Sequence, residues 1–132
     1  MIVLWDDLIV VVEAKLGSAN DRQTRDLWRF NRYLRRQEQW APSREEIKAE
    51  GRYELARNWV IAWELTERTG ADLAVPANLA PAVLADDVAS FRTLVATSSE
   101  RRVAHVHWQS LLADPSPDWL KRYATSLALR DL

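Results

Sequence analysis

A run of five branched apolar residues, residues 8–12 (LIVVV), places the strongest constraint on how this chain folds. Branched side chains favour extended backbone, and an uninterrupted run of them predicts a β-strand that is buried on both faces. The run continues directly into Glu13, Ala14 and Lys15. A strand that lies in the core therefore ends in two opposite charges, and any account of the chain has to explain them.

A second β-rich run, MIVLW at positions 1–5, precedes the first, and only Asp6 and Asp7 separate the two. A two-residue connection between such runs is typical of a β-hairpin. The expected pairs are Trp5 with Leu8, Val3 with Val10 and Met1 with Val12.

Helix and strand signals alternate along the rest of the chain. Apolar residues at helical spacing, a capping box of Ser43 and Glu46, and prolines and glycines at the boundaries mark the elements. We expect helices over about 20–37, 43–69, 86–97 and from 116 onward, and strands over 71–81 and 101–108. Neither repeats nor long linkers interrupt the pattern, so the sequence predicts one α/β domain over residues 1–132.

Composition limits the classes of function. The chain has 132 residues, of which 48% are apolar and 28% charged, as in a soluble domain with a core. It has no cysteine, which excludes disulfides and thiolate metal sites. Neither a membrane-spanning run nor the basic start of a signal peptide is present, so we expect a cytoplasmic protein without a membrane partner. The net charge of -1 means that any nucleic-acid binding depends on local charge.

Glu13 and Lys15 are the residues of the strand that carry chemistry. Side chains alternate across a strand, so these two lie on one face, about 6.6 Å apart along it. A carboxylate at a strand end is suited to hold a divalent cation, with the carbonyl of Ala14 as a further oxygen ligand. Lys15 would then orient a water or neutralise charge on a phosphate. Lysine is rare here, since Lys15, Lys48 and Lys121 are the only lysines among 18 basic residues.

Arginines recur along the helix expected over about 20–37. Their spacing of three and four residues places five guanidinium groups on one face, roughly opposite the apolar stripe. These are Arg22, Arg25, Arg29, Arg32 and Arg36. A solvated helix face is one interpretation of the pattern, and contact with nucleic-acid phosphates is the other.

The order of strand, Glu-x-Lys, short loop and helix resembles the PD-(D/E)XK nuclease superfamily. The matching residues are Glu13, Ala14 and Lys15, followed by Gln23, which is similar to a glutamine that several of its families carry after the catalytic strand. Residues 71–81 resemble a later core strand. The resemblance implies a restriction-endonuclease-like mixed sheet flanked by helices. It also implies hydrolysis of DNA phosphodiesters with Mg²⁺ or Mn²⁺, in which the Glu binds metal and the Lys assists the attacking water.

One element of the family pattern has no counterpart. The family places a metal-binding Asp on the preceding strand, but the predicted hairpin puts the position opposite Glu13 before Met1. Asp7 lies about 20 Å from Glu13 along the strand. The chain thus resembles a nuclease domain that begins just after this Asp, without the first helix and strand of the core. The sheet edge left open in this way would suit a homodimer.

Several patterns have a structural alternative. Glu13 and Lys15 would also form an ion pair at a strand end, and Gln23 with Asn20 would also form a helix cap. His105 and His107 share a strand face but lack a third ligand, which favours ordinary polar positions. The sequence leaves open an active nuclease and an inactive relative that binds nucleic acid or protein.

Overall fold

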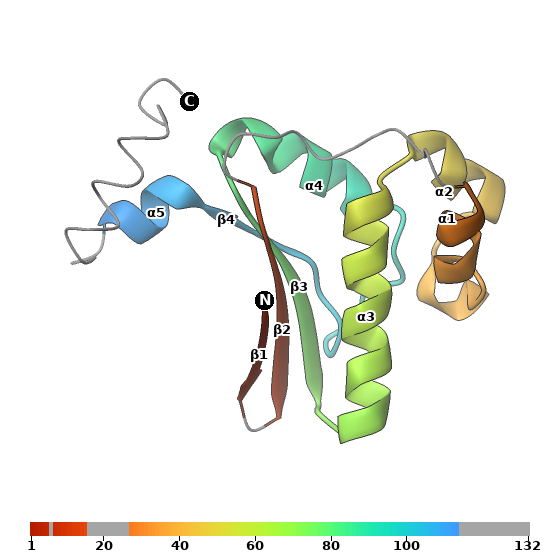
Figure 1. Cartoon of the computed structure of the whole chain (residues 1–132), viewed down its shortest axis with the longest axis horizontal. Coiled ribbons are helices and arrows are strands. Elements are labelled where there is room, and N and C mark those ends of the chain that lie inside the picture. Colours follow the sequence, from red (N-terminus) through yellow and green to blue (C-terminus); the bar gives the residue numbers. More distant parts are fainter. Residues whose placement is uncertain (6, 16–26, 114–132) are drawn as a thin grey trace.

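The computed structural model describes residues 1–5, 7–15 and 27–113, which form strands and helices in alternation (Figure 1). The strands are β1 (Ile2–Trp5), β2 (Leu8–Ala14), β3 (Leu73–Ala80) and β4 (Ala104–His107). The α-helices are α1 (Leu27–Tyr33), α2 (Arg44–Glu50), α3 (Tyr53–Thr69), α4 (Ala85–Arg92) and α5 (Trp108–Ala113). The 3₁₀ helix η1 (Gln37–Gln39) follows α1, and η2 (Ala82–Leu84) precedes α4.

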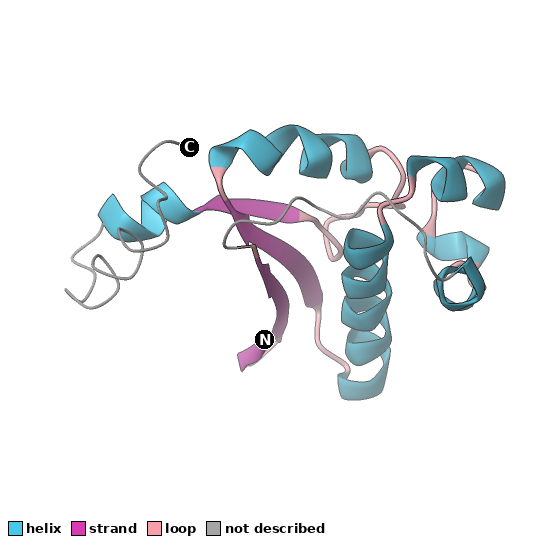
Figure 2. Ribbon diagram, turned by 45° about the horizontal axis from the view of Figure 1, so that its top comes forward, coloured by secondary structure: helices cyan, strands magenta, loops and turns pink. Residues whose placement is uncertain are grey.

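The strands of the described residues form one mixed sheet in the order β1-β2-β3-β4, with helices around it (Figure 2). β1 and β2 are antiparallel, whereas β2, β3 and β4 run parallel to one another. The long helix α3 connects β2 and its preceding helices to β3 and packs on both strands. The expected α/β class with a mixed sheet flanked by helices is therefore confirmed.

The hairpin has the predicted register. Trp5 pairs with Leu8 and Val3 with Val10. The pairing ends at Met1, whose carbonyl accepts a hydrogen bond of 2.7 Å from the amide of Val12 and whose amino group donates one of 2.9 Å to the Val12 carbonyl. The hairpin pairing is therefore defined up to Val12, one residue before Glu13. A slip of one position would move every side chain of the strand to the other face of the sheet, which makes this register specific.

Burial along β2 alternates, so the expectation of a strand buried on both faces is wrong in part. Ile9 and Val11 are almost completely buried and form a small core with Ala62 of α3 and Ala74 of β3. Leu8, Val10 and Val12, on the other face, are only half-buried. The face that carries Ile9 and Val11 also carries Glu13 and Lys15, so both charges follow directly from the packed side of the strand.

The single helix expected over 43–69 is two helices. Ser43 and Glu46 form the predicted capping box at the start of α2. Gly51 then adopts a left-handed conformation, with φ of 62°, and its amide bonds back to the carbonyls of Ile47 and Lys48. This geometry ends a helix and suits glycine. Gly70, with φ of 75°, ends α3 as predicted.

Other boundaries differ by a few residues. α1 ends at Tyr33 instead of near residue 37, α4 ends at Arg92 instead of near residue 97, and β4 begins at Ala104 instead of residue 101. Leu94 and Val95, which follow the end of α4, are nevertheless in the core. The start of the first predicted helix and the helix expected from 116 onward lie outside the described residues.

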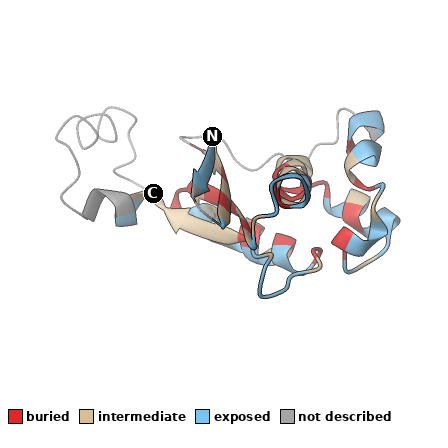
Figure 3. Cartoon of the chain, turned by 90° about the horizontal axis from the view of Figure 1, so that it is seen from below, coloured by how far each residue is buried: buried red, intermediate tan, exposed pale blue. Residues whose placement is uncertain are grey.

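The main core lies where α1, α2, α3 and α4 meet. It contains Phe30, Leu34, Ile47, Leu55, Trp59, Val88 and Phe91, all buried, with Trp40 and Val103. Burial of such large apolar side chains is the main source of stability in a domain of this size. Figure 3 shows buried residues along α3, whereas α2 is mostly exposed. The position of α3 is therefore fixed by packing on two sides.

β1 forms an open edge of the sheet within the described residues. Its apolar side chains are unusually accessible, with Ile2 52% and Leu4 64% exposed. In the described part of the chain, no helix combines the length and apolar character needed to cross a membrane. The expected homodimer across this edge remains a prediction.

Candidate functional site

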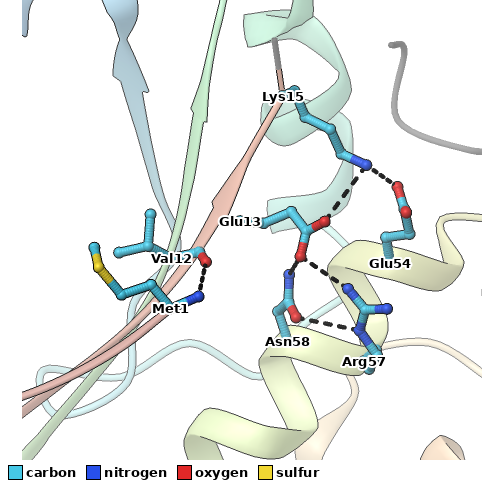
Figure 4. Close-up of polar contacts among 7 residues, drawn as sticks. All are labelled: Met1, Val12, Glu13, Lys15, Glu54, Arg57 and Asn58. Atoms are coloured by element: carbon cyan, nitrogen blue, oxygen red, sulfur yellow. Dashed lines mark hydrogen bonds and ion pairs between the residues drawn. The ribbon is translucent and has the colours of Figure 1, made fainter. Parts of the chain in front are cut away.

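The candidate site lies where β2 ends against the first turns of α3 (Figure 4). β2 and β3 are parallel there, and the carboxyl ends of parallel strands are a common place for ligand sites in α/β sheets. Glu13 and Lys15 both point from β2 toward α3, as alternation along the strand predicts. Together with three residues of α3 they form the strand-end cluster, which consists of Glu13, Lys15, Glu54, Arg57 and Asn58.

Glu13 is held by three nitrogen groups (Figure 4). Its Oε2 accepts hydrogen bonds from Nη2 of Arg57 at 2.8 Å and from Nδ2 of Asn58 at 3.1 Å. Its Oε1 lies 3.6 Å from Nζ of Lys15. Hydrogen bonds from cationic groups to a carboxylate are stronger than bonds between neutral groups. The predicted juxtaposition of Glu13 and Lys15 is therefore present, with a second cation beside it.

Lys15 is more deeply buried than Glu13, with 6% of its side chain exposed against 24%. Its amine forms an ion pair with Glu54 in addition to Glu13. Its amide donates to the carbonyl of Leu79 at 2.9 Å, and its carbonyl accepts from the indole of Trp108 at 2.9 Å. Main-chain bonds on both sides thus fix the position from which the amine reaches the cluster.

The environment of Glu13 favours its charged form. Burial acts in the opposite direction and raises the pKa, because a charge loses contact with water. The hydrogen bond from Asn58 and the charges of Arg57 and Lys15 outweigh burial, so the pKa of Glu13 lies below its ordinary value of 4.5. At neutral pH Glu13 is therefore an anion, and its charge is stabilised by the nitrogen groups around it.

The strand-end cluster is electrically balanced, with two carboxylates, one ammonium and one guanidinium. The structural alternative for Glu13 and Lys15, an ion pair at the strand end, is thus also present. A network of this kind ties β2 to α3 and rigidifies the strand end. The same contacts serve both interpretations.

Asn78 of β3 lies beside Glu13 in the sheet, since the two residues are register partners. It is 2% exposed, and neither its side-chain oxygen nor its nitrogen has a hydrogen-bond partner among the described residues. Both residues, with Asn58, line a cavity of about 10 Å³. This is the space of roughly one water-sized group. Buried amides without partners are rare, and this cavity has room for one water-sized partner of Asn78.

The donor set can be compared with the needs of a divalent cation. Mg²⁺ prefers oxygen ligands and carboxylates, which Glu13 and the amide oxygen of Asn78 would supply. Lys15 and Arg57 oppose a further positive charge. Within the described ranges, no group of three His, Cys, Asp or Glu residues is arranged to hold a metal. The residues therefore offer one carboxylate and neutral oxygens to a cation, with two positively charged side chains beside them.

The neighbour of Glu13 on the β1 side provides no carboxylate. The hairpin pairing ends with Met1 and Val12, and Asp7 lies at the opposite end of β2, where it accepts a bond from the amide of Leu73. The observed register therefore puts the position opposite Glu13 before Met1, as the predicted hairpin does. Asn78 on the other side is the polar group that the sheet places closest to Glu13.

The arginine face predicted for the first helix is described in part. Arg22, Gln23 and Arg25 lie outside the described residues. Arg29 and Arg32 are exposed on α1, and their guanidinium carbons lie 5.5 and 5.7 Å from the centre of the Trp28 ring.

Arg36 does not belong to this helix face. It follows the end of α1 and forms ion pairs with two carboxylates, Glu38 at 2.7 Å and Glu67 of α3 at 2.5 Å. Those bonds raise the pKa of its guanidinium above the ordinary range. Inclusion of Arg36 in the phosphate-binding stripe is unsupported, because its charge is already neutralised.

The three residues that α3 contributes to the strand-end cluster were not predicted from the sequence. Glu54, Arg57 and Asn58 share one helix face at spacings of three and four residues, which is a signal in the sequence. The spacing does not indicate which strand the face contacts. A larger cavity, of about 670 Å³, lies between α1 and α3 and was not predicted either; we call it the arginine cavity.

The two histidines of β4 lie together, with ring centres 4.7 Å apart. Burial, the neighbouring His107 and Arg92 lower the pKa of His105 below its ordinary value of 6.5. His105 is also the register partner of Asn78 in the sheet. Within the described residues, no third His, Cys, Asp or Glu is grouped with the pair.

Comparison with known proteins gives no assignment. No family model matches the chain, and neither a curated protein nor a solved structure is significantly similar to it.

Proposed function

We propose that this chain is a PD-(D/E)XK-type domain of restriction-endonuclease-like fold that hydrolyses DNA phosphodiester bonds with a divalent metal. One observation carries the proposal. Glu13 and Lys15 lie on one face of β2 at its carboxyl end, with the amine 3.6 Å from the carboxylate. This is the constellation that the Glu-x-Lys resemblance implies, and the mixed sheet with a parallel β2-β3 pair is compatible with it.

The residues that would hold Mg²⁺ or Mn²⁺ are Glu13, the carbonyl of Ala14 and the amide oxygen of Asn78. A bound cation at this place would activate a water and neutralise negative charge on the phosphate. The depressed pKa of Glu13 supports this role, since the carboxylate stays ionised well below neutral pH.

The remaining residues of the strand-end cluster have roles of their own. Lys15 orients the attacking water and neutralises charge on the phosphate through its amine. Glu54 is a positioning residue, because it holds that amine by an ion pair. Asn58 and Arg57 hold the Glu13 carboxylate from the other side. A supporting role for Gln23 is part of the proposal, and it is based only on the resemblance to the PD-(D/E)XK superfamily.

Contact with the DNA backbone is assigned to the exposed arginines of the first helix. Arg29 and Arg32 carry this part of the proposal in the described residues, and Arg22 and Arg25 extend it by sequence spacing. Neutralisation of phosphates by arginine gives affinity that falls steeply with salt.

The proposal is tested with purified protein, linear and plasmid DNA, and Mg²⁺, Mn²⁺ or EDTA. Cleavage is expected with metal only, and Glu13→Gln should abolish it while keeping the shape of the side chain. Glu50→Gln, an exposed position on α2, is the matched control and should cleave like the parent. Cleavage that survives both EDTA and Glu13→Ala would contradict the mechanism.

A catalytically inactive relative that binds nucleic acid or protein is the second candidate. The balanced charges of the strand-end cluster favour it, because each carboxylate there already has a cation beside it. It predicts salt-sensitive DNA binding without hydrolysis. Replacement of Arg25, Arg29 and Arg32 by Glu should abolish that binding. Metal-dependent cleavage lost in Glu13→Gln would exclude this candidate.

A homodimer through β1 is proposed as a further property. Edge strands with unpaired backbone groups and exposed apolar side chains favour pairing with a second strand, and Ile2 and Leu4 are such residues. Sedimentation velocity should show a dimer that Leu4→Lys converts into a monomer. A parent chain that sediments as a stable monomer would remove the proposal.

A further inference from the structure

The arginine cavity between α1 and α3 has a lining made mostly of polar and charged side chains. Its volume of about 670 Å³ falls in the range of small-molecule sites. Five arginines line it, together with aromatic residues, Gln39 and one acid, Glu64. None of the strand-end cluster lines it except Arg57.

Positive charge in this cavity exceeds negative charge. Arg36 is neutralised by Glu38 and Glu67, and Arg57 is bound to Glu13. Arg32 and Arg35, in contrast, form no ion pair within the described residues. Guanidinium groups without a carboxylate partner are well suited to bind phosphate oxygens, often through two bonds at once.

Aromatic rings stand beside these cations. Trp28 is 57% exposed although it is a large apolar residue, and Arg29 and Arg32 lie against its ring. Tyr33 and Tyr53 add a second aromatic surface, with ring centres 5.6 Å apart. Nucleobases stack on exposed aromatic rings and on guanidinium planes, whatever their sequence.

Gln39 provides an independent observation. It is completely buried and lines the cavity, yet neither its side-chain nitrogen nor its oxygen has a hydrogen-bond partner in the part of the chain that the structure describes. Its main chain is fixed, because its carbonyl accepts bonds from the Trp59 indole and the Ala96 amide. A free amide with one donor group and one acceptor matches the edge of a nucleobase, adenine above all.

We propose that the arginine cavity binds one nucleotide unit. Its phosphate lies on Arg32 and Arg35, its base stacks on Trp28 and its base edge bonds to Gln39. This inference deepens the proposed function, since Arg57 both lines the cavity and holds Glu13. A strand seated there would lie next to the strand-end cluster. The unit is either a nucleotide of single-stranded DNA or a free nucleoside phosphate, which share this chemistry.

Calorimetric titration with EDTA present tests the proposal without any metal chemistry. The probes are dAMP, deoxyadenosine, inorganic phosphate and a deoxyadenylate oligonucleotide. We expect dAMP, the oligonucleotide or both to bind at least about tenfold more tightly than phosphate or deoxyadenosine, because base and phosphate are bound together. Binding by the oligonucleotide alone assigns a DNA strand as the ligand, and binding by both with competition assigns the nucleotide unit itself.

Variants locate the binding. Arg35→Gln and Trp28→Leu should each weaken it about tenfold, since one removes a phosphate contact and the other a stacking surface. Arg68→Gln, an exposed position on α3 outside the lining, removes the same charge and should leave affinity unchanged. Gln39→Leu should reduce the preference for adenine and keep the fold, because it replaces an unpaired buried amide with an apolar group.

The proposal is overturned if no nucleotide probe binds more tightly than inorganic phosphate. It is equally overturned if Arg35→Gln and Trp28→Leu bind like Arg68→Gln. Nucleotide binding is expected to persist in Glu13→Gln, so a chain without nuclease activity still allows the cavity to be judged.

Discussion

The two polar regions on either side of Arg57 differ in how their charges are satisfied. In the strand-end cluster each carboxylate has a cation within ion-pair distance, and Lys15 touches both Glu13 and Glu54. In the arginine cavity Arg32 and Arg35 have no such partner among the described residues, and Glu64 is the single acid of the lining. The charges of the strand-end cluster are neutralised by other groups of the protein. The charges of Arg32 and Arg35 in the arginine cavity are not neutralised by any described residue.

Burial explains this difference. The side chain of Lys15 is 6% exposed, and a charge removed from water in this way is costly unless a partner compensates it. Arg32 and Arg35 are exposed to water, so they need no internal partner and can exchange water for phosphate. The balanced charges of the strand-end cluster suit the proposed catalytic site. The excess positive charge of the arginine cavity suits the proposed binding of a phosphate.

Removal of the lysine amine gives the largest expected effect. Lys15→Met should reduce metal-dependent cleavage by about 100-fold or more, since a positioned amine contributes on that order. It should also lower the free energy of unfolding by about 2 kcal/mol, because two carboxylates lose their common partner. Cleavage rates and urea denaturation measure the two effects. Lys48→Met on α2 is the control and should change neither.

Full cleavage activity in Lys15→Met would contradict a catalytic role of the strand-end cluster, which would then contribute to stability alone. A loss of stability without a change in rate would support the ion-pair interpretation of Glu13 and Lys15.

Paired and unpaired arginines should differ in DNA binding. Removal of Arg32 and Arg35 together should flatten the dependence of log affinity on log salt by about 0.7 for each phosphate of a single strand that the protein no longer neutralises. Arg36→Gln removes the same charge from the same cavity but from a guanidinium that Glu38 and Glu67 already hold. Its effect on the slope should be much smaller. Equal effects in an anisotropy titration over several salt concentrations would show that ion pairing does not separate the two classes.

Protonation of Glu13 at acid pH should lower the free energy of unfolding, and we expect this effect to be smaller than those above. Its folded pKa lies below the ordinary value of 4.5, so the unfolded chain takes up the proton first as pH falls. The stabilising contribution is complete above about pH 4.5 and is lost as pH falls through the folded pKa. The slope is at most about 1.4 kcal/mol per pH unit for one proton. Denaturation of the parent and of Glu13→Gln between pH 3 and 6 measures it, and the variant should lack this loss.

His105 should cause a separate loss of folding stability, at a higher pH than the loss caused by Glu13. Burial, His107 and Arg92 lower its pKa below 6.5, so the folded state holds the neutral ring. As pH falls below about 6.5 the unfolded chain gains a proton first, and stability declines until the folded pKa is passed. His105→Gln should abolish this decline and leave the loss below pH 4.5 intact. A parent chain with constant stability between pH 7 and 5 would contradict the assignment.

Local rules predicted the hairpin and the direction of its charges. The two-residue turn fixed the register from Trp5 and Leu8 onward, and alternation along β2 placed Glu13 and Lys15 on one face. Both inferences hold because they depend on neighbours in the sequence and on the period of a strand. The capping box at Ser43 and the stop at Gly70 were predictable for the same reason.

Long-range packing produced what the sequence did not show. Glu54, Arg57 and Asn58 reach Glu13 and Lys15 only because α3 crosses the end of β2. The break at Gly51 was overlooked because apolar residues recur on both sides of it, and it sets where α3 begins. Arg36 fits the helical spacing of the arginines, yet α1 ends before it, and Glu67 of α3 binds it. Such pairings depend on the angle between elements, which spacing alone does not determine.

Uptake of Mn²⁺, followed by the electron paramagnetic resonance signal of the free ion, tests the central claim most directly. That claim is that the Glu13 carboxylate at the end of β2 belongs to a cation site beside Lys15. The parent and the Glu50→Gln control should withdraw Mn²⁺ from solution equally, and Glu13→Gln should bind it at least about tenfold more weakly, because a neutral amide replaces the charged ligand. Identical Mn²⁺ uptake by the parent and Glu13→Gln would contradict the account.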